Sequence, residues 1–428
     1  MRFSFLTTEV KPERAVLVGV EWRQSSWPVD RSLDELERLA DTAGAVVVGR
    51  LTQRLERPVP KSFIGSGKVE ELKSLVGRLE ADVVIFDEDL TPAQQSHLER
   101  AVGEPVKIID RTALILDIFG LHAKTREGRL QVQLAQLQYL LPRLRGMWSH
   151  LAKEQTRGGI GSRFGQGESQ LEVDRRLIRN RISSLRRELK ELERRRAVQA
   201  KGRVESDAFR IALAGYTNAG KSTLLNALTG SDVLSQDKLF ATLDPTTRAY
   251  TLPGGRIVTL TDTVGFIQKL PHGLVEAFKS TLSEVLGADL ILKVIDVSDE
   301  DRHRHEEAVD RVLDEIGAGE RPSLTVYNKI DLLDPEEVGL LRARMPRAVF
   351  FSARTGDGLD LLLDRLSAEA AANDRLISAD VPYREGGLLK LVHEQGQLIS
   401  EEYLADRVRI VAKVPARIAG RLERFRTE

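Results

Sequence analysis

The sequence contains no cysteine among its 428 residues, which excludes disulfides, thiolate metal sites and cysteine nucleophiles. Long hydrophobic runs are missing as well. No stretch approaches the roughly 18 apolar residues of a membrane span, and the N-terminus lacks the apolar core of a signal peptide. Neither charge is in excess, since 64 lysines and arginines balance 64 acidic residues. These absences predict a soluble, cytoplasmic protein that does not engage membranes and whose bulk charge indicates no partner. We also expect the protein to be monomeric.

The length predicts several domains, and the hydrophobic patterns separate them. Short apolar, β-branched runs alternate with helical patterns and predict an α/β domain over residues 1–142. Its long amphipathic stretch after Asp110 is predicted to be helical and to stop at Pro142. Its expected strands lie at 14–20, 44–48, 81–86 and 105–109.

A second set of such runs predicts another α/β domain over residues 206–372, with a doubly wound, mostly parallel sheet. Residues 371–375 are interpreted as a linker, and 373–428 as a small α+β domain with a strand at 407–414. The expected strands of the 206–372 domain lie at 209–214, 256–261, 290–297, 323–327 and 348–351.

The region from 143 to 205 is basic, because residues 143–196 hold fifteen lysines and arginines against seven acidic residues. Its glycine-rich part, Arg157 to Ser169, predicts a flexible loop. A helical arm is predicted to follow, as a hairpin or short coiled coil, because aliphatic residues recur there in steps of three, four or seven. These are Leu171, Ile178, Ile182, Leu185, Leu189 and Leu192.

A phosphate-binding loop is the strongest motif, because its eight residues join a predicted strand to a predicted helix. Backbone N–H groups of such a loop surround phosphates, Lys221 supplies a cation to the β- and γ-phosphates, and Ser222 offers a hydroxyl to Mg²⁺. The loop is Gly215, Tyr216, Thr217, Asn218, Ala219, Gly220, Lys221 and Ser222.

Guanine specificity is predicted from a second motif, 107 residues beyond Lys221, at the end of the 323–327 run. Asp331 is expected to accept two hydrogen bonds from guanine that adenine does not offer, with Asn328 and Lys329 bracing the loop. The base-binding residues are expected to be Asn328, Lys329, Ile330, Asp331, Ser352, Ala353 and Arg354.

Two further segments are expected to respond to the γ-phosphate. In the first, Thr242 is the threonine chosen as a Mg²⁺ ligand with Ser222. In the second, Asp262 is expected to hold a Mg²⁺-bound water and Gly265 to meet the γ-phosphate, so that Lys221, Thr242 and Gly265 act on the reacting group. The segments are Phe240, Ala241, Thr242, Leu243 and Asp244, then Asp262, Thr263, Val264 and Gly265.

Phe266 stands where many switch GTPases carry the glutamine that orients the attacking water. We therefore expect slow hydrolysis by the isolated chain and acceleration by a partner. Asn218 resembles the asparagine of potassium-stimulated GTPases, which suggests K⁺ as a second cation. His303 and His305 lie in an acidic, exposed-looking turn and receive no role.

Together these motifs resemble the HflX family of translation-factor-related GTPases. The resemblance extends upstream to Asp110-Arg-Thr112, to the run from Leu130 to Leu144 and to Gly158–Gly167. It implies a cytoplasmic GTPase that binds the rRNA of the large ribosomal subunit and splits or rescues stalled ribosomes under stress. The basic region agrees with contact to RNA phosphates, and Trp148 and Phe164 are candidates for stacking on bases.

Two alternatives remain open at this stage. A non-ribosomal signalling GTPase would use the aliphatic stripe of its helical arm to bind a protein partner. A ribosome-assembly or RNA-modification GTPase would share the basic region but act on a different RNA. Binding to ribosomes in the GTP and GDP states separates these possibilities.

Overall fold

The computed structural model describes residues 11–23, 27–144, 164–203, 208–230, 239–240, 242–269, 271, 274, 284–372 and 374–427. The chain divides into two compact units. Unit 1 contains residues 1–192 and the short segment 269–277, and unit 2 contains residues 193–268 and 278–428. None of the described helices is long and apolar enough to cross a bilayer.

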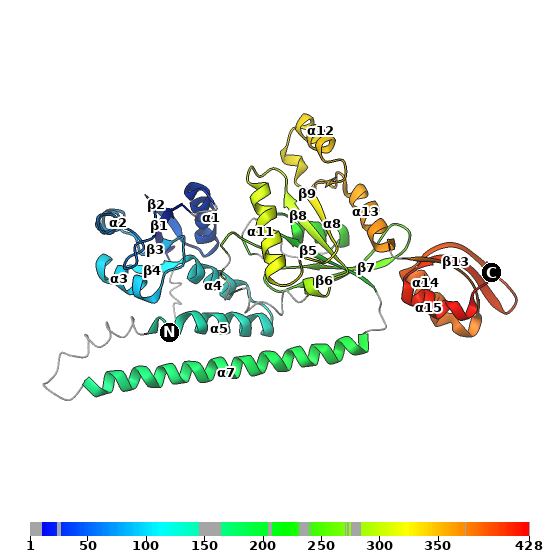
Figure 1. The fold of residues 1–428 in the computed structure, drawn as a ribbon, viewed down its shortest axis with the longest axis horizontal. Coiled ribbons are helices and arrows are strands. Elements are labelled where there is room, and N and C mark those ends of the chain that lie inside the picture. Colours follow the sequence, from blue (N-terminus) through cyan, green and yellow to red (C-terminus); the bar gives the residue numbers. More distant parts are fainter. Residues whose placement is uncertain are drawn as a thin grey trace, which may run out of the picture. The chain divides into compact units, whose positions relative to one another are not determined.

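Unit 1 is built on a parallel four-stranded sheet of order β2-β1-β3-β4 (Figure 1). The predicted alternation is confirmed, although β2 begins two residues later and runs six residues further than the expected strand. Branched side chains such as Val16, Val84 and Ile108 form the core. The elements are β1 (Arg14–Glu21), α1 (Val29–Thr42), β2 (Val46–Arg54), α2 (Ser66–Leu79), β3 (Val83–Phe86), α3 (Pro92–Val102) and β4 (Lys107–Asp110).

The amphipathic stretch after Asp110 forms two helices, α4 (Arg111–His122) and α5 (Arg126–Leu140), where one continuous pattern was expected. The break has a local cause, because Thr125 caps α5 by accepting a hydrogen bond from the Gly128 N–H at 2.9 Å. Asp110 caps α4 in the same way through the Ala113 N–H. The positions of the capping residues, rather than the periodicity of the apolar residues, therefore determine where these helices begin.

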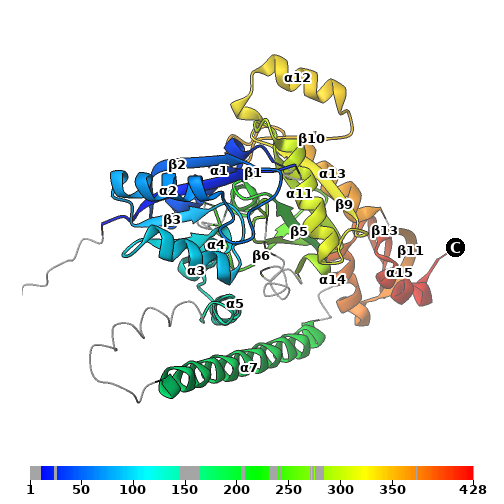
Figure 2. The same ribbon diagram turned by 60° about the vertical axis from the view of Figure 1, so that its left-hand side comes forward.

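The predicted helical arm forms one helix, α7 (Phe164–Arg203), which packs beside α5 (Figure 2). Arg181 bonds to Gln133 and Arg126 lies 3.8 Å from Glu188, so the two helices run antiparallel. A hairpin or short coiled coil was predicted within residues 143–205, but the partner of α7 is α5, which was assigned to the 1–142 domain. The predicted end of the glycine-rich loop at Ser169 was wrong, because α7 already begins at Phe164. Residues 157–163 and Trp148 lie outside the described part of the chain.

Unit 2 contains a six-stranded sheet of order β10-β9-β8-β5-β7-β6, in which only β6 is antiparallel to its neighbour (Figure 1). This confirms the mostly parallel, doubly wound prediction. The elements are β5 (Phe209–Gly215), α8 (Lys221–Thr229), β6 (Thr246–Thr251), β7 (Ile257–Asp262), β8 (Leu290–Asp296), α11 (Arg302–Glu315), β9 (Ser323–Asn328), α12 (Pro335–Arg344), β10 (Val349–Phe350) and α13 (Leu359–Ala371).

The C-terminal part of unit 2 is an antiparallel sheet of order β11-β13-β12 with two helices on one face. The predicted strand at 407–414 is confirmed as β13. The segment interpreted as a linker is anchored, because buried Asp374 forms a 2.7 Å ion pair with Arg256. The elements are β11 (Arg375–Pro382), α14 (Gly386–Gln395), β12 (Gln397–Tyr403), β13 (Arg407–Val414) and α15 (Ala416–Leu422).

Candidate functional site

The phosphate loop connects β5 to α8, and its glycines stand where no side chain fits. A Cβ on Gly215 would lie 2.3 Å from the Val294 carbonyl oxygen. A Cβ on Gly220 would lie 2.1 Å from Asn328 Nδ2, and Gly220 has a φ of +93° that favours glycine. The glycine spacing found in the sequence therefore reflects close backbone approach from β8 and β9.

Lys221 is buried at the first turn of α8. Its Nζ donates to the carbonyl oxygens of Gly215 at 3.1 Å and Tyr216 at 2.9 Å, so the ammonium is held inside the loop. Burial lowers the pKa of Lys221 to about 8. A bound phosphate would favour the charged form, because an opposite charge raises the pKa of an amine.

The predicted metal ligands come together at one point. Ser222 Oγ lies 2.6 Å from Asp262 Oδ2 and 3.0 Å from Thr242 Oγ1. Asp262 is fully buried, burial raises its pKa, and its Oδ1 has no hydrogen-bond partner in the described part of the chain. Two hydroxyls beside a buried carboxylate with an unsatisfied oxygen fit a hard divalent cation such as Mg²⁺.

Thr242 was chosen from three threonines, and the structure sets it apart from the other two. Thr246 and Thr247 belong to β6, and the Thr247 hydroxyl lies 2.9 Å from that of Thr261. The Thr247 hydroxyl is thus paired within the sheet, whereas the Thr242 hydroxyl faces Ser222. Its neighbours Phe240 and Leu243 are buried, and Ala241 lies outside the described residues.

The two base-binding motifs meet beside the phosphate loop. Asn328 Nδ2 donates to the Ala219 carbonyl at 2.9 Å, and Asn328 Oδ1 accepts from the Ala353 N–H at 2.9 Å. The Ser352 hydroxyl donates to Asp331 Oδ1 at 2.6 Å, and Arg354 pairs with Asp331 Oδ2. One asparagine side chain therefore joins the phosphate loop to the loop around the Asp331 carboxylate.

Lys329 and Ile330 complete this corner of the site. Lys329 has a φ of +70°, and its Nζ is held 2.7 Å from Asp296 Oδ2 at the end of β8. Ile330 is buried in the apolar cluster beside β9. Lys329 is thereby positioned by an ion pair that the sequence motif did not indicate.

The segment after Asp262 lies against the phosphate loop. The Phe266 N–H donates to the Gly215 carbonyl at 3.0 Å, and the Thr217 N–H donates to the Phe266 carbonyl at 2.7 Å. A Cβ on Gly265 would lie 2.8 Å from Thr217, which explains the glycine. Before it, Val264 is buried and the Thr263 hydroxyl donates to the Leu213 carbonyl at 2.6 Å. Phe266 itself is buried and carries no polar side-chain atom.

Sequence reasoning missed the surroundings of Tyr216. His305 was interpreted as exposed, but it lies in α11 with a side chain only 12% exposed. Its ring stacks on Tyr216 with 3.9 Å between centroids and 24° between planes, and its Nδ1 lies 3.7 Å from Asp299. The acidic context that made this turn look solvated in fact supplies a partner for the ring.

Lys269 was also missed. It belongs to unit 1, where its Nζ pairs with Asp87 and Glu88 and lies 3.1 Å from the Ser32 hydroxyl. Asp87 in turn pairs with the buried Arg111. The positive charges of Arg111 and Lys269 hold the pKa of the Asp87 carboxyl below its usual range. No local pattern predicts an ion pair across this sequence separation.

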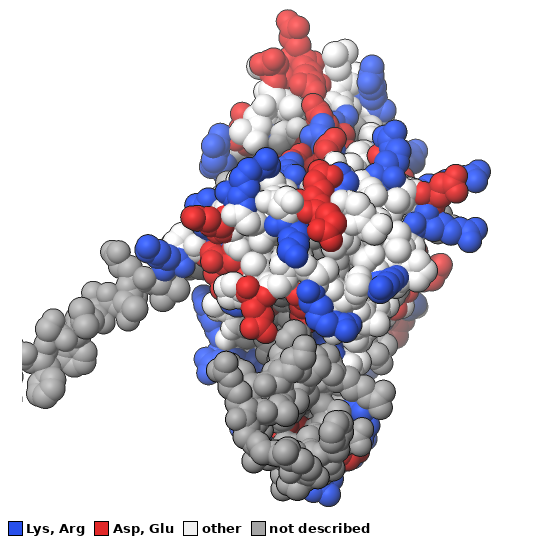
Figure 3. Space-filling view, turned by 90° about the vertical axis from the view of Figure 1, so that its left-hand side faces the viewer, with Lys and Arg blue, Asp and Glu red and all other residues white. Residues whose placement is uncertain are grey.

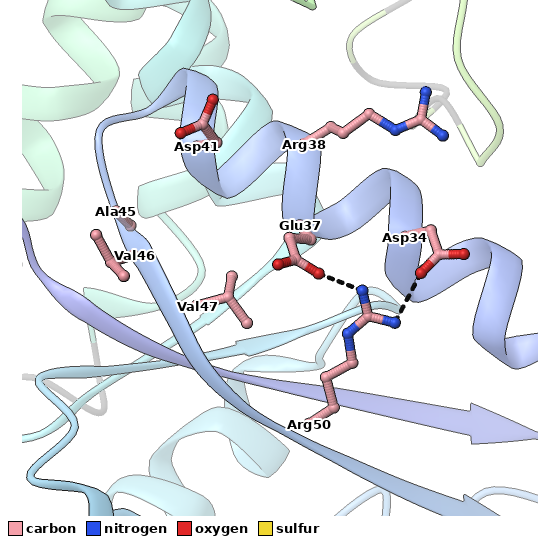
Figure 4. Close-up of a pocket in the computed structure, with 8 residues that line it drawn as sticks. All are labelled: Asp34, Glu37, Arg38, Asp41, Ala45, Val46, Val47 and Arg50. Atoms are coloured by element: carbon pink, nitrogen blue, oxygen red, sulfur yellow. Dashed lines mark hydrogen bonds and ion pairs between the residues drawn. The ribbon is translucent and has the colours of Figure 1, made fainter.

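A separate surface hollow lies between α1 and β2 (Figure 4). Arg50 points from β2 toward Asp34 and Glu37 on α1 and pairs with both. These carboxylates raise the pKa of Arg50. Because two arginines stand against three acidic residues in its lining, the hollow has no concentrated charge of one sign with which to hold an ion.

The sheet, the phosphate loop and the Asp331 corner define a P-loop GTPase. Three family models match consecutive parts of the chain: GTP-binding GTPase N-terminal at residues 30–120, GTP-binding GTPase middle region at 122–203 and 50S ribosome-binding GTPase at 210–329.

Proteins named GTPase HflX are similar to this chain over nearly their whole length. The one from Caldanaerobacter subterraneus subsp. tengcongensis is 48% identical over 96% of this chain and 94% of its own. Those from Magnetococcus marinus and Escherichia coli strain K12 are both 44% identical, over 98% and 92% of this chain and 96% and 91% of theirs. The chain belongs to the HflX family of GTPases, and it is an enzyme that binds and hydrolyses GTP.

Proposed function

We propose that this GTPase acts on the large ribosomal subunit, binding its rRNA and splitting or rescuing stalled ribosomes. Within the nucleotide site, Lys221 contacts the β- and γ-phosphates, Ser222 and Thr242 ligate Mg²⁺, Gly265 meets the γ-phosphate and Asp331 recognises guanine. Asn218, whose φ is +61°, is the proposed contact for K⁺. The enzyme is proposed to reside in the cytoplasm.

The observation that carries the ribosomal proposal is a basic face on α7. Four exposed side chains, Arg176, Arg179, Arg187 and Lys190, follow helical spacing on the side opposite Ile182 and Leu185. They span 15 residues, from Arg176 to Lys190, and therefore about 21 Å of helix. Arg179 has a distant acidic neighbour, Glu172 at 3.8 Å, but an exposed pair of that length contributes little. Such a row suits an RNA backbone.

The same geometry disfavours the signalling alternative. That reading needs the aliphatic stripe of α7 for a protein partner, but Ile182 and Leu185 are buried against Leu130 and Leu134 of α5. The stripe is therefore already covered by α5. On the face shown in Figure 3, positive and negative side chains are interspersed, whereas the row on α7 has four basic side chains with Glu172 as an acidic neighbour. The matching family description, 50S ribosome-binding GTPase, supports the same choice of partner.

Co-sedimentation with purified ribosomal subunits tests the proposal. We expect binding to the large subunit with a non-hydrolysable GTP analogue, weaker binding with GDP, and a steep loss with salt. Each phosphate contact removed should reduce the slope of log affinity against log salt by about 0.7–0.9. A variant with Arg176, Arg179 and Arg187 changed to Gln should bind weakly and show a shallower slope.

Two exposed arginines on α12, Arg342 and Arg344, provide the matched control for charge removal. Changing them to Gln should leave ribosome binding intact. Light scattering of intact ribosomes mixed with enzyme and GTP then separates splitting from assembly or RNA modification. Absence of large-subunit binding in every nucleotide state would remove the proposal, and binding without subunit dissociation would favour an assembly role.

We further propose that turnover is slow without the ribosome, since Phe266 offers no group to orient water. Steady-state hydrolysis with and without large subunits measures this, and rates in K⁺ and Na⁺ test the role of Asn218. Equal rates with and without subunits would contradict the stimulation.

A further inference from the structure

Gln268 has an unusual environment for a polar side chain. It is 2% exposed, and neither its Oε1 nor its Nε2 has a hydrogen-bond partner among the residues that the structure describes. Buried amides are nearly always paired, because an unsatisfied donor or acceptor loses its hydrogen bonds to water without replacement. Packing alone would be served better by an apolar residue of the same size, so this carboxamide needs an explanation.

The position of Gln268 in the chain supplies one. It follows Gly265 by three residues, and Phe266 between them has no polar side chain. The backbone N–H of Gln268 donates to the Tyr216 hydroxyl at 2.6 Å. Tyr216 belongs to the phosphate loop, so the carboxamide is carried by a residue tied directly to the loop that binds phosphate.

Residues 265–268 do not form a helical turn, because Phe266 is held in a parallel bridge with Tyr216 and the turn begins only at Gln268. In a helical turn, residues three apart bring their side chains to within roughly 5–6 Å. Coiling of residues 265–268 would therefore bring the carboxamide over the point that the Gly265 N–H faces.

We propose that Gln268 is the residue that orients the attacking water in GTP hydrolysis, and that the Phe266 bridge and the Tyr216 hydroxyl hold it in reserve. In the reacting state the carboxamide oxygen accepts a hydrogen bond from the water. The water oxygen bonds to the γ-phosphorus while the bond from that phosphorus to the β–γ bridging oxygen breaks. The electron pair stays with GDP, and both protons of the water leave with inorganic phosphate as H₂PO₄⁻.

Tyr216 and His305 are positioning residues in this arrangement. The stacked His305 ring fixes the Tyr216 ring, and the tyrosine hydroxyl then fixes the Gln268 backbone. Lys269, with a φ of +52°, turns the chain immediately after Gln268.

The decisive variant is Gln268→Met in the full chain, assayed by single-turnover hydrolysis with Mg²⁺ and K⁺. We expect hydrolysis to fall about 100-fold, a typical contribution of a positioned polar group to proton transfer. Affinity for GDP should stay within twofold. The thermal midpoint should not fall, because an unsatisfied amide is replaced by an apolar side chain of similar size. A structural glutamine would instead lower the midpoint and leave the rate unchanged.

Binding of GDP with aluminium fluoride, which imitates the γ-phosphoryl group in transfer, gives a second readout. Gln268→Met should lose this ternary complex while keeping GDP, and retained GDP binding also shows that the variant is folded. Gln395→Met is the matched control, since Gln395 is likewise buried with an Oε1 that has no partner in the described part of the chain, but it ends α14 in the C-terminal sheet domain. It should leave hydrolysis unchanged.

Tyr216→Phe tests the holding arrangement separately. Loss of the hydroxyl frees the Gln268 backbone while keeping the stacked ring, so hydrolysis should rise severalfold. A Gln268→Met rate within threefold of the parent, or an intact aluminium fluoride complex, overturns the catalytic assignment. A fall in rate for Tyr216→Phe overturns the proposal that the tyrosine holds Gln268 in reserve.

Discussion

Replacing Asn328 by alanine should separate the two halves of the nucleotide site. The change removes the bond to the Ala219 carbonyl and the bond from the Ala353 N–H, both 2.9 Å long and both buried. Each protein group left unpaired costs about 1–3 kcal/mol, so the nucleotide-binding arrangement should lose about 2–6 kcal/mol. Because about 1.4 kcal/mol is a tenfold change, even the lower end predicts a loss of GDP affinity of roughly 30-fold.

Fluorescence anisotropy of labelled GDP measures this loss, and urea unfolding of the same protein shows whether the sheet remains intact. Asn180, an exposed asparagine on α7, is the control position, and Asn180→Ala should bind GDP like the parent. Asn328→Asp keeps an acceptor for Ala353 but turns a carboxylate oxygen toward the Ala219 carbonyl, so it should not rescue binding. A folded Asn328→Ala protein with GDP affinity within threefold of the parent would refute the reasoning.

Three other changes probe neighbouring features. Gly220→Ala forces a Cβ to 2.1 Å from Asn328 Nδ2 at a φ of +93°, so calorimetry should show at least about tenfold weaker GDP binding, and unchanged binding would contradict the steric argument. Thr242→Ala should weaken Mg²⁺-dependent binding of a GTP analogue about tenfold while Thr247→Ala does not, and equal effects would reject the chosen threonine. Arg256→Met should destabilise unit 2 by about 3 kcal/mol in urea unfolding, because it leaves Asp374 buried without its cation. Adding Asp374→Leu should restore much of the lost stability, and no recovery in the double variant would count against the pair.

The sheet of unit 2 and the positions of its loops were predictable because the chemistry lies in contiguous motifs. A loop such as Gly215–Ser222 needs glycines where backbones approach, and a parallel sheet brings the ends of β5, β7 and β9 to one edge. The prediction that Ser222, Thr242 and Asp262 lie together needs only these motifs and this arrangement of strands. Local sequence therefore carries most of the information about the nucleotide site.

Features that depend on pairing between distant residues were not predictable in the same way. The stacking of His305 on Tyr216 joins residues 89 positions apart, and the acidic sequence around His305 suggested solvent instead. The division between α4 and α5 was missed because the apolar period continues through it, while the cap of Thr125 decides the local structure. Arg256 and Asp374 resemble surface residues in sequence, and only the fold shows that burial joins them.

The pair of Arg256 and Asp374 also has a mechanical meaning. Arg256 precedes β7 directly, Asp374 precedes β11 directly, and Asp262 is the last residue of β7. An extended strand paired on both sides, as β7 is with β5 and β6, resists stretching and transmits axial displacement. A force on the C-terminal sheet is therefore transmitted through Asp374 and Arg256 to the start of β7. The other end of this stiff strand carries the Asp262 carboxylate beside Ser222.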